Sequence, residues 1–318
     1  MTLHPQSQAF LDAMAAANGP NWPDMELGEA RRAFDGLPFF GDPPEVGDVS
    51  DHQITGIAVR IYKPINAADG DAAVGDAAGR DLDAIVYFHG GGWVLGSIES
   101  HDVLCRRLAN LSGAAVVSVD YRRPPEDPFP AAVEDCYTVC DVLSLDHASY
   151  GISNRMVVAG DSAGGNLCVA VGLMSRERGG PPLQGQVLIY PVLDGSMSGE
   201  SYEQFAIGYG LTRDTMAWFW KNYTGDSEST SRSNPLASPM NAKDLSGLPA
   251  AHVLIAQYDV LKSECEIFAK RLVDAGVPTT TEHSAGMLHG FIHFAEPFDD
   301  ALPATKEIAK RCRQFLDA

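Results

Sequence analysis

The stretch from Met156 to Ala170 constrains the fold of this chain more than any other. A short apolar run is broken by Gly160-Asp161-Ser162-Ala163-Gly164, and a pattern of small residues at helical spacing then continues to Arg178. This order predicts a buried strand, a sharp turn and a helix, with one serine at the turn. The glycines keep side chains away from a cramped backbone, and the helix directs its free N–H groups toward the serine. Ser162 is therefore a candidate nucleophile beside a place where an anion can be stabilised.

A second glycine-rich turn lies upstream. Residues 83–88 have the composition of a buried strand, which leads directly into His89-Gly90-Gly91-Gly92-Trp93. Three consecutive glycines leave backbone N–H groups exposed and let them approach a ligand closely. Alone, this stretch would indicate a flexible glycine loop. Upstream of a serine turn, it is typical of the backbone element that binds the oxyanion formed when the serine attacks a carbonyl.

Helical and strand patterns alternate along most of the chain. We expect strands at 114–119, 186–190, 251–257 and 278–283, and helices at 101–111, 131–143, 263–275 and 304–316. Such alternation predicts a mainly parallel sheet covered by helices on both faces, with the site at the carboxyl ends of the strands.

Three kinds of segment near the N-terminus depart from this alternation. Two short helices are expected at 5–17 and 25–34, followed by one antiparallel strand at 54–62 near the edge of the sheet. Residues 66–80 are rich in Ala, Gly and Asp, which predicts a solvated excursion between strands.

A fourth departure, residues 194–248, holds many of the aromatic side chains. Thr212 is expected to cap a helix that runs to Lys221. Aromatic residues at helical spacing usually belong to a core. Because this segment is inserted between two strands of the sheet, a cap that folds over the pocket and meets the N-terminal helices is an equal alternative.

Three residues that follow predicted strands have the types needed for nucleophilic catalysis. Ser162, Asp259 and His289 occur in the order serine, acid, histidine, and each lies after a strand at the same end of the sheet. A serine hydroxyl needs a base to remove its proton, and the base needs a third group to orient it. Asp194 is a second candidate for the acid, whereas Asp161 is expected to brace the turn.

The other histidines and the cysteines favour structural roles. His283 lies inside a predicted strand. His293 follows His289 by four residues, which raises the alternative of a metal pair, but no glutamate occupies the position that a zinc hydrolase helix requires. We therefore predict no metal site. The six cysteines lack a Cys-x-x-Cys pair and are expected to be buried free thiols.

The charge balance limits the partners. The chain has 23 basic and 42 acidic side chains and a formal net charge of −19, which argues against nucleic-acid and anionic-membrane partners. The first residues lack the basic start and apolar core of a signal peptide, and no apolar run approaches membrane-spanning length. These features predict a cytoplasmic protein. A homodimer is compatible with the sequence, which does not determine the oligomeric state.

Together these motifs resemble those of one family. The chain is similar to the hormone-sensitive-lipase-like branch of the α/β-hydrolases, the bacterial family IV esterases, over nearly its whole length. The matching stretches occur in the same order as in the family: 89–93, 121–130, 160–166, Asp259-x-Leu261 and His289-Gly290-Phe291.

The resemblance implies a fold, a site and a reaction. It implies the α/β-hydrolase fold, with a mostly parallel eight-stranded sheet flanked by helices and a helical cap. Residues 1–45 and 195–248 would form the cap, and residues 46–194 and 249–318 the catalytic domain. Ser162, Asp259 and His289 would be the triad. The N–H groups of Gly91, Gly92 and Ala163 would form the oxyanion hole.

The implied function is a cofactor-free carboxylesterase that hydrolyses small, short-chain esters through an acyl-enzyme intermediate. Four bulky aromatic residues are expected to narrow the substrate pocket: Trp93, Tyr190, Phe205 and Trp218. A longer-chain lipase is an alternative within the class. A small-molecule receptor on the same fold is an alternative outside it, but such receptors have lost the catalytic histidine, whereas His289 is present.

The chain departs from the family pattern at two places. Val260 and Lys262 stand where the family usually has proline and arginine, and Arg123-Pro124 interrupts the usual crossover after Tyr121. Both departures adjoin the expected pocket and bear on substrate choice, which the sequence does not reveal.

Overall fold

An eight-stranded sheet runs through the centre of the molecule. This computed structural model describes residues 2–17, 19–37, 41–65, 81–226, 230–295 and 297–318, so the excursion expected at 66–80 lies outside the described residues. The strands are β1 (Asp48–Ile54), β2 (Ile57–Lys63), β3 (Leu82–Phe88), β4 (Ala115–Asp120), β5 (Ile152–Asp161), β6 (Leu183–Ile189), β7 (Ala251–Tyr258) and β8 (Thr279–Leu288).

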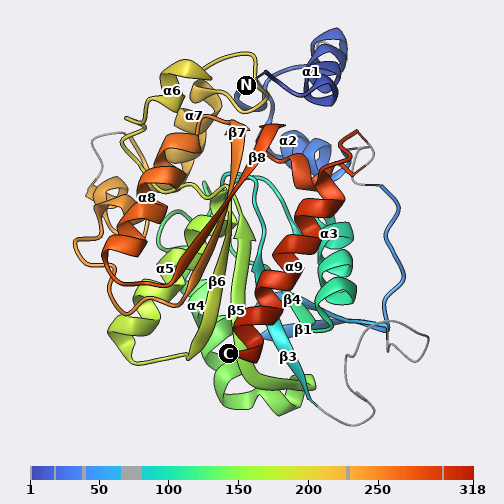
Figure 1. Cartoon of the computed structure of the whole chain (residues 1–318), viewed down its shortest axis with the longest axis vertical. Coiled ribbons are helices and arrows are strands. Elements are labelled where there is room, and N and C mark those ends of the chain that lie inside the picture. The colour runs from blue at the N-terminus through green and yellow to red at the C-terminus, as the bar shows by residue number, and fades with distance from the viewer. Residues whose placement is uncertain (1, 18, 38–40, 66–80, 227–229, 296) are drawn as a thin grey trace.

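The spatial order of the strands is β1-β2-β4-β3-β5-β6-β7-β8 (Figure 1). From β4 to β8 all neighbours are parallel, whereas β2 pairs antiparallel with both β1 and β4. Parallel strands need crossover helices, and these cover both faces of the sheet. The mostly parallel eight-stranded sheet of the predicted fold is therefore confirmed.

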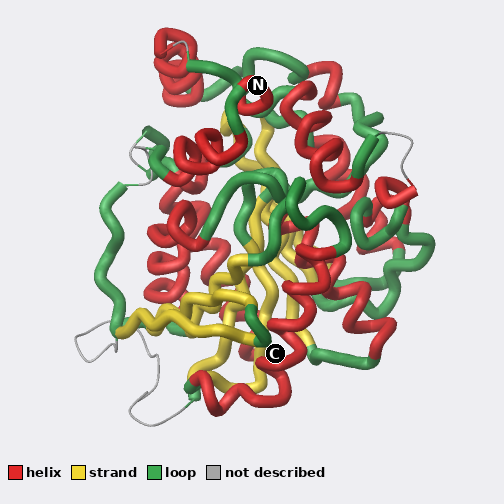
Figure 2. The backbone as a smooth tube through the Cα atoms, turned by 180° about the vertical axis from the view of Figure 1, so that it is seen from behind, coloured by secondary structure: helices red, strands yellow, loops and turns green. Residues whose placement is uncertain are grey.

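Helices form the outer layers of the molecule. The α-helices are α1 (Pro5–Ala17), α2 (Leu27–Asp35), α3 (Ile98–Ser112), α4 (Ala131–Asp146), α5 (Ala163–Arg178), α6 (Ser201–Gln204), α7 (Arg213–Thr224), α8 (Lys262–Asp274) and α9 (Ala301–Asp317). Short 3-10 helices are η1 (Trp22–Asp24), η2 (His147–Tyr150), η3 (Thr230–Ser233), η4 (Pro239–Asn241) and η5 (Phe291–His293). Helices α3 and α9 pack on one face, and α4, α5 and α8 pack on the other (Figures 1 and 2).

Two predicted strands differ from the structure. The antiparallel strand expected at 54–62 near the sheet edge is confirmed as β2, but its start is wrong, because Thr55 and Gly56 form a turn, with φ of 51° and 88°, and the preceding strand β1 was not predicted. Strand β1 is mostly polar and lies at the exposed edge, so apolar alternation does not reveal it. The last strand, expected at 278–283, continues to Leu288.

The N-terminal segment and the segment inserted between β6 and β7 are in contact with each other. Thr212 caps α7 as expected, because its side chain accepts a hydrogen bond from the N–H of Thr215. Helix α7 packs against η1, so the inserted segment meets the N-terminal segment there. Ser7 on α1 donates a hydrogen bond to the carbonyl of Gly286. Helices α1, α6 and α7 lie at the upper end of the molecule in Figure 1, with α1 on one side of the N-terminus and α6 and α7 on the other.

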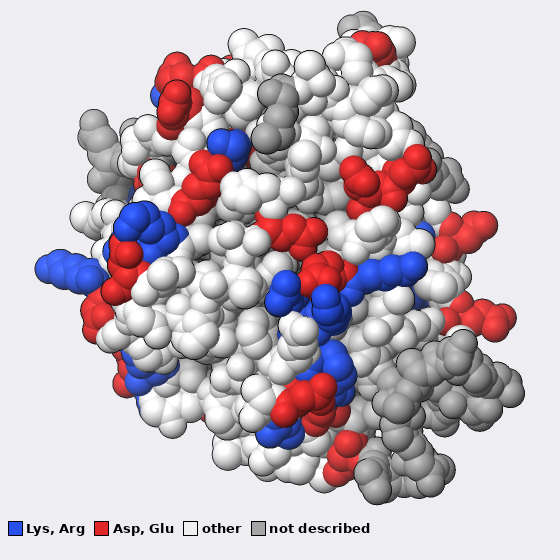
Figure 3. Space-filling view, viewed as in Figure 1, with Lys and Arg blue, Asp and Glu red and all other residues white. Residues whose placement is uncertain are grey.

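The surface carries interspersed charges. On the face shown in Figure 3, lysine and arginine side chains lie beside acidic ones instead of forming one separate basic area. Among the described residues, the helices are all too short or too polar to cross a membrane. All six cysteines are buried and free, as the sequence predicted.

Candidate active site

Ser162 stands at a sharp turn between β5 and α5. Its φ of 54° and ψ of −116° are rarely adopted by residues other than glycine, and strain of this kind often marks functional sites. Its N–H donates to the carbonyl of Ile189 on the neighbouring strand β6, and its carbonyl accepts from Val192. The sheet therefore holds the strained backbone on both sides.

The turn can form because Gly164 has no side chain. A Cβ atom at Gly164 would lie 1.8 Å from the carbonyl oxygen of Phe88 and 2.9 Å from that of His89. The start of α5 therefore packs directly on the end of β3, where the glycine loop 90–92 begins. The two glycine-rich motifs, separated by about 70 residues in the sequence, are in contact.

The structure brings together the three residues that the sequence selected. The Nε2 atom of His289 lies 3.0 Å from Ser162 Oγ, and its Nδ1 atom lies 2.7 Å from Asp259 Oδ2. With its proton on Nδ1, the ring donates to Asp259 and can accept the serine proton at Nε2. The other oxygen of Asp259 accepts from the N–H of Leu261 at 3.0 Å, and this carboxyl is 1% exposed. The arrangement has the parts needed to activate a hydroxyl.

The alternative candidates lie elsewhere. The carboxylate of Asp194 accepts hydrogen bonds from the hydroxyls of Ser196 and Ser198. His283 is half exposed in β8. The Nε2 atom of His293 faces Asp161, whereas that of His289 faces Ser162, so these two histidines do not direct these atoms at one metal position.

The glycine loop offers unused donors. Among the described residues, no group accepts a hydrogen bond from the N–H of Gly91, Gly92 or Ala163. Gly91 and Gly92 have φ of 99° and 59°, a region open to glycine. A carbonyl of Gly91 instead accepts from Leu95, which folds the loop back on itself. Free backbone donors beside a serine hydroxyl can stabilise a tetrahedral oxyanion.

The four aromatic residues expected in the pocket have different surroundings. Tyr190 lies beside the site, with its ring 4.6 Å from that of His289. Phe205 packs near Tyr209 and Tyr258, the residue before Asp259. Trp93 is fully buried and stacks on Tyr223 of α7 at 4.1 Å. Trp218 is partly buried beside Phe219.

Phe219 is an aromatic neighbour of the site that the sequence analysis did not single out. A Cβ atom at Gly92 would lie 2.1 Å from Cγ of Phe219, so this ring rests on the glycine loop. Phe219 stands between Trp218 and Trp220, and the phase of helix α7 decides which of the three faces the loop. Composition alone carries no signal for that choice.

Two more buried carboxyl groups lie near the site, and the hydrogen bonds that their side chains accept come from residues other than Ser162. Asp161 accepts from Tyr87 and from the N–H of Gly90. Glu264 accepts from the N–H groups of Leu193 and Asp194, and burial raises its pKa well above the usual value. Glu264 follows Asp259 by five residues and lies in the first turn of α8. A glutamate in the helix directly after the candidate acid Asp259 is the sequence signal that could have indicated it.

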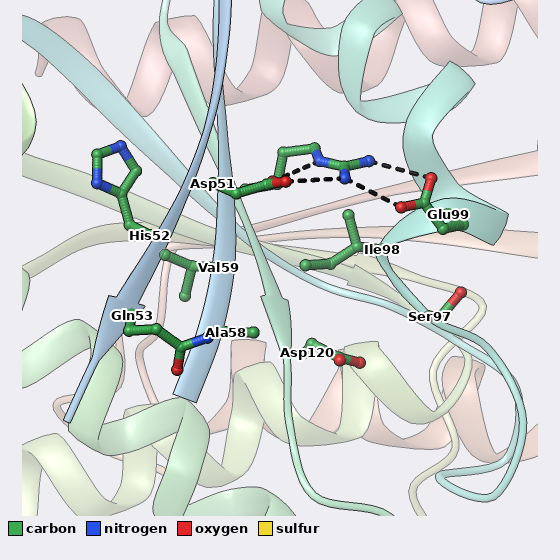
Figure 4. Close-up of a pocket in the computed structure, with 10 residues that line it drawn as sticks. Asp51, His52, Gln53, Ala58, Val59, Ser97, Ile98, Glu99 and Asp120 are labelled. Carbon is green, nitrogen blue, oxygen red and sulfur yellow. Dashed lines mark hydrogen bonds and ion pairs between the residues drawn. The ribbon is translucent and has the colours of Figure 1, made fainter. Parts of the chain in front are cut away.

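A separate surface pocket of about 480 Å³ lies at the edge of the sheet, between the β1–β2 hairpin and α3. Figure 4 shows Asp51, Glu99 and Asp120 among its lining residues. The guanidinium of Arg60 pairs with Asp51 and Glu99 there. None of the residues that line this pocket belongs to the group around Ser162.

Comparison with known proteins agrees with this geometry. The family model Abhydrolase_3, described as the alpha/beta hydrolase fold, matches residues 85–293. The carboxylic ester hydrolase LipN of Mycobacterium tuberculosis is 35% identical over 280 residues, which cover 85% of this chain and 71% of that protein. The ethyl acetate hydrolase of Pseudomonas putida is 32% identical, over 99% of this chain and 100% of that protein.

Solved structures show the same relationship. The ester hydrolase EH1AB1 from the metagenome of Lake Arreo is 36% identical and has a TM-score of 0.91, with full coverage of both chains. This chain therefore shares its overall fold with solved ester hydrolases, and the resemblance seen in the sequence is confirmed. The chain belongs to the Abhydrolase_3 family of alpha/beta hydrolases, in its hormone-sensitive-lipase-like esterase branch.

Proposed function

We propose that the protein is a serine carboxylesterase with Ser162 as nucleophile, His289 as base and Asp259 as the acid that orients the base. The observation that carries this proposal is the chain of contacts Asp259–His289–Ser162, at 2.7 and 3.0 Å. Two relatives are named as ester hydrolases, one of them matched over 99% of this chain and 100% of its own length, and they support the same reaction.

The reaction follows from the positions of these groups. Ser162 Oγ attacks the ester carbonyl carbon while His289 takes the Ser162 proton, and the carbonyl π electrons move to the carbonyl oxygen. When the tetrahedral intermediate collapses, the bond to the alcohol breaks, and His289 gives the proton to the departing alcohol oxygen. Water then attacks the acyl-enzyme in the same way, which releases the acid and restores Ser162.

The N–H groups of Gly91, Gly92 and Ala163 would hold the oxyanion. They lie in two motifs that touch at Gly164, and they have no acceptor among the described residues. Losing one such donor typically raises the barrier by about 3 kcal/mol. The backbone of the glycine loop would therefore contribute to catalysis on the same scale as a side chain of the triad.

We propose small, short-chain esters as substrates. Phe219 packs directly against Gly92, and we place this ring beside the acyl group of the bound ester. Together with this ring, the aromatic residues Trp93, Tyr190, Phe205 and Trp218 would bound the pocket. A relative that covers the whole chain is named an ethyl acetate hydrolase, which agrees with a small substrate.

Residues 1–45 and 195–248 would form the cap over this pocket. The contact between η1 and α7 supports that division, because it joins the two segments over the same end of the sheet. Arg31 of α2 also donates to the carbonyls of Val94 and Pro124, which ties the N-terminal segment to the glycine loop and the crossover. A cytoplasmic location and a homodimer stay predictions from the sequence.

Labelling with a fluorophosphonate, alongside hydrolysis of p-nitrophenyl acetate, tests the proposal. The wild-type chain should form a covalent adduct and turn over the ester, and Ser162→Ala should do neither while its melting temperature stays close to wild type. A receptor on this fold would show no adduct. A lipase would hydrolyse p-nitrophenyl palmitate faster than the acetate ester.

A further inference from the structure

A buried carboxylate lies under the glycine loop, and the reaction described above does not use it. Asp161 immediately precedes Ser162 and is 4% exposed. Its Oδ1 atom accepts hydrogen bonds from the hydroxyl of Tyr87 at 2.7 Å and from the N–H of Gly90 at 3.0 Å. Gly90 is the residue directly before the two glycines whose N–H groups face the oxyanion position.

Asp161 also contacts Gly90 closely through its other carboxylate oxygen. A Cβ atom at Gly90 would lie 2.2 Å from Asp161 Oδ2 and 2.9 Å from its Cγ. The carboxylate thus packs against the Cα of the loop residue while it accepts from the N–H of the same residue. The Asp161 side chain therefore fixes both the position of Gly90, the first residue of the glycine loop, and the orientation of its N–H group.

The same carboxylate reaches the loop that bears the catalytic histidine. Nε2 of His293 lies 3.1 Å from Asp161 Oδ2, and His293 follows His289 by four residues, in the short helix η5. His101 on α3 completes the cluster, with Nε2 at 3.2 Å from Asp161 Oδ1. Burial favours the neutral acid, but His101 and His293 outweigh it and hold the pKa of Asp161 well below its usual range. The Asp161 carboxylate is therefore charged, and its close partners lie in β3, the glycine loop, α3 and η5.

We propose that Asp161 is a positioning residue that couples the oxyanion loop to the loop of the catalytic histidine. Its Oδ1 holds Gly90, its Oδ2 holds His293, and its own backbone leads into Ser162. One side chain thereby sets the relative placement of the three parts of the site. This inference rests on the proposed esterase function and adds a residue that touches neither substrate nor the reacting atoms.

A metal ion is the competing explanation of the cluster. The ligand atoms of His101, Asp161 and His293 lie within 4.8 Å of one another. However, the N–H of Gly90 is directed at both Asp161 Oδ1 and His101 Nε2, at 3.0 and 3.2 Å. A cation would need the lone pairs of Asp161 Oδ1 and His101 Nε2, to which the Gly90 N–H is directed. Hydrogen bonds therefore account for the cluster better than a metal ion does.

Kinetics of variants at Asp161 test the coupling. In Asp161→Asn the amide oxygen can still accept from Gly90, but the amide nitrogen cannot accept from His293. We expect kcat to fall about 10-fold in Asp161→Asn and about 100-fold in Asp161→Ala, near the range for loss of an oxyanion donor. KM should change less than about twofold, because the loop geometry acts in the transition state. Affinity for a trifluoromethyl ketone, which places an oxyanion in the hole, should fall in parallel with kcat.

The histidine side of the coupling has its own test. Gln can place an N–H donor where His293 Nε2 lies, so His293→Gln should retain most of kcat, whereas His293→Ala should lose about 10-fold. In the Asp161→Asn background, His293→Ala should cause little further loss, because the link is already broken. These variants leave the core intact and keep the proposal falsifiable where Asp161→Ala does not fold.

Asp135→Asn is the matched control. Asp135 is also 4% exposed, but it pairs with Arg122 and has no contact with the glycine loop. This variant should lose stability without loss of kcat. Unchanged kcat and ketone affinity in both Asp161 variants, a loss confined to KM, or one equivalent of tightly bound metal in the purified protein would overturn the inference. Wild-type turnover and fluorophosphonate labelling test the esterase proposal separately.

Discussion

At the scale of single residues, the geometry of the site depends on glycines that have no side chain as much as on the side chains of Ser162, Asp259 and His289. Ser162 keeps a φ of 54° because hydrogen bonds from Val192 and to Ile189 hold it, and because Gly164 lets α5 approach β3. Such a strained residue persists only where its surroundings over-determine it. Backbone packing therefore positions Ser162, the proposed nucleophile, independently of His289 and Asp259.

Gly164→Ala should damage the site severely. The added methyl group would lie 1.8 Å from the Phe88 carbonyl oxygen, so α5 or β3 must shift. We expect a stability loss of up to about 3 kcal/mol, together with a large fall in kcat. Gly172→Ala, on the same helix, is the control. Its nearest contact would be an ordinary 3.5 Å, and thermal melting should show equal or higher stability. Equal tolerance of both variants would refute this explanation.

Glu264 gives a prediction about pH. Burial raises the pKa of this carboxyl in the folded state, so the folded chain keeps a proton that the unfolded chain releases above about pH 4.5. The free energy of unfolding should therefore fall as pH rises, by up to roughly 1 kcal/mol per pH unit. Glu264→Gln carries no such proton. Its melting temperature relative to wild type should rise steadily from pH 5 to pH 8, and a constant difference would show that Glu264 is ionised in the fold.

At the scale of elements, α7 connects the inserted segment to the glycine loop. Thr212 in the sequence predicts the N-cap of α7. On the inner side of the helix, Tyr223 stacks on Trp93 and Phe219 packs against Gly92. Residues 218–220 are three consecutive aromatic residues. The three atoms nearest to a Cβ at Gly92 would all belong to Phe219. Composition marks the segment as aromatic, whereas the rotation of the helix determines which ring borders the site.

Phe219→Ala should change chain-length preference. Removing the ring opens space beside Gly92, so kcat/KM for p-nitrophenyl hexanoate should rise at least about tenfold relative to that for the acetate ester. Trp218→Ala, one position along the helix, is the comparison. If the preference shifts with Trp218 and not with Phe219, the pocket lies on the side of α7 that the sequence analysis favoured.

At the scale of the whole molecule, the sequence predicts the central sheet well and its edge poorly. The strands from β3 to β7 are buried apolar runs, and their alternation with helices follows from burial on both faces. Strand β1 has the sequence Asp-Val-Ser-Asp-His-Gln-Ile and pairs only with β2, at the edge of the sheet. Most of its side chains are polar, so the sequence shows no hydrophobic alternation that would predict it.

The site divides in the same way. Ser162, Asp259 and His289 could be selected because each follows a strand within a recognisable motif. The links from Asp161 to Tyr87, Gly90 and His293 could not, because they join residues up to 132 positions apart through packing that no local pattern records. Long-range contacts of this kind appear only once the chain is folded.

The most direct test of the whole proposal is a crystal structure of the adduct formed with diethyl p-nitrophenyl phosphate. We predict a covalent bond from phosphorus to Ser162 Oγ, with the phosphoryl oxygen about 2.7–3.1 Å from the N–H nitrogens of Gly91, Gly92 and Ala163. The His289 ring should stay hydrogen-bonded to Asp259. A phosphoryl group attached to another residue, or a phosphoryl oxygen directed to solvent away from the glycine loop, would contradict the proposed reaction.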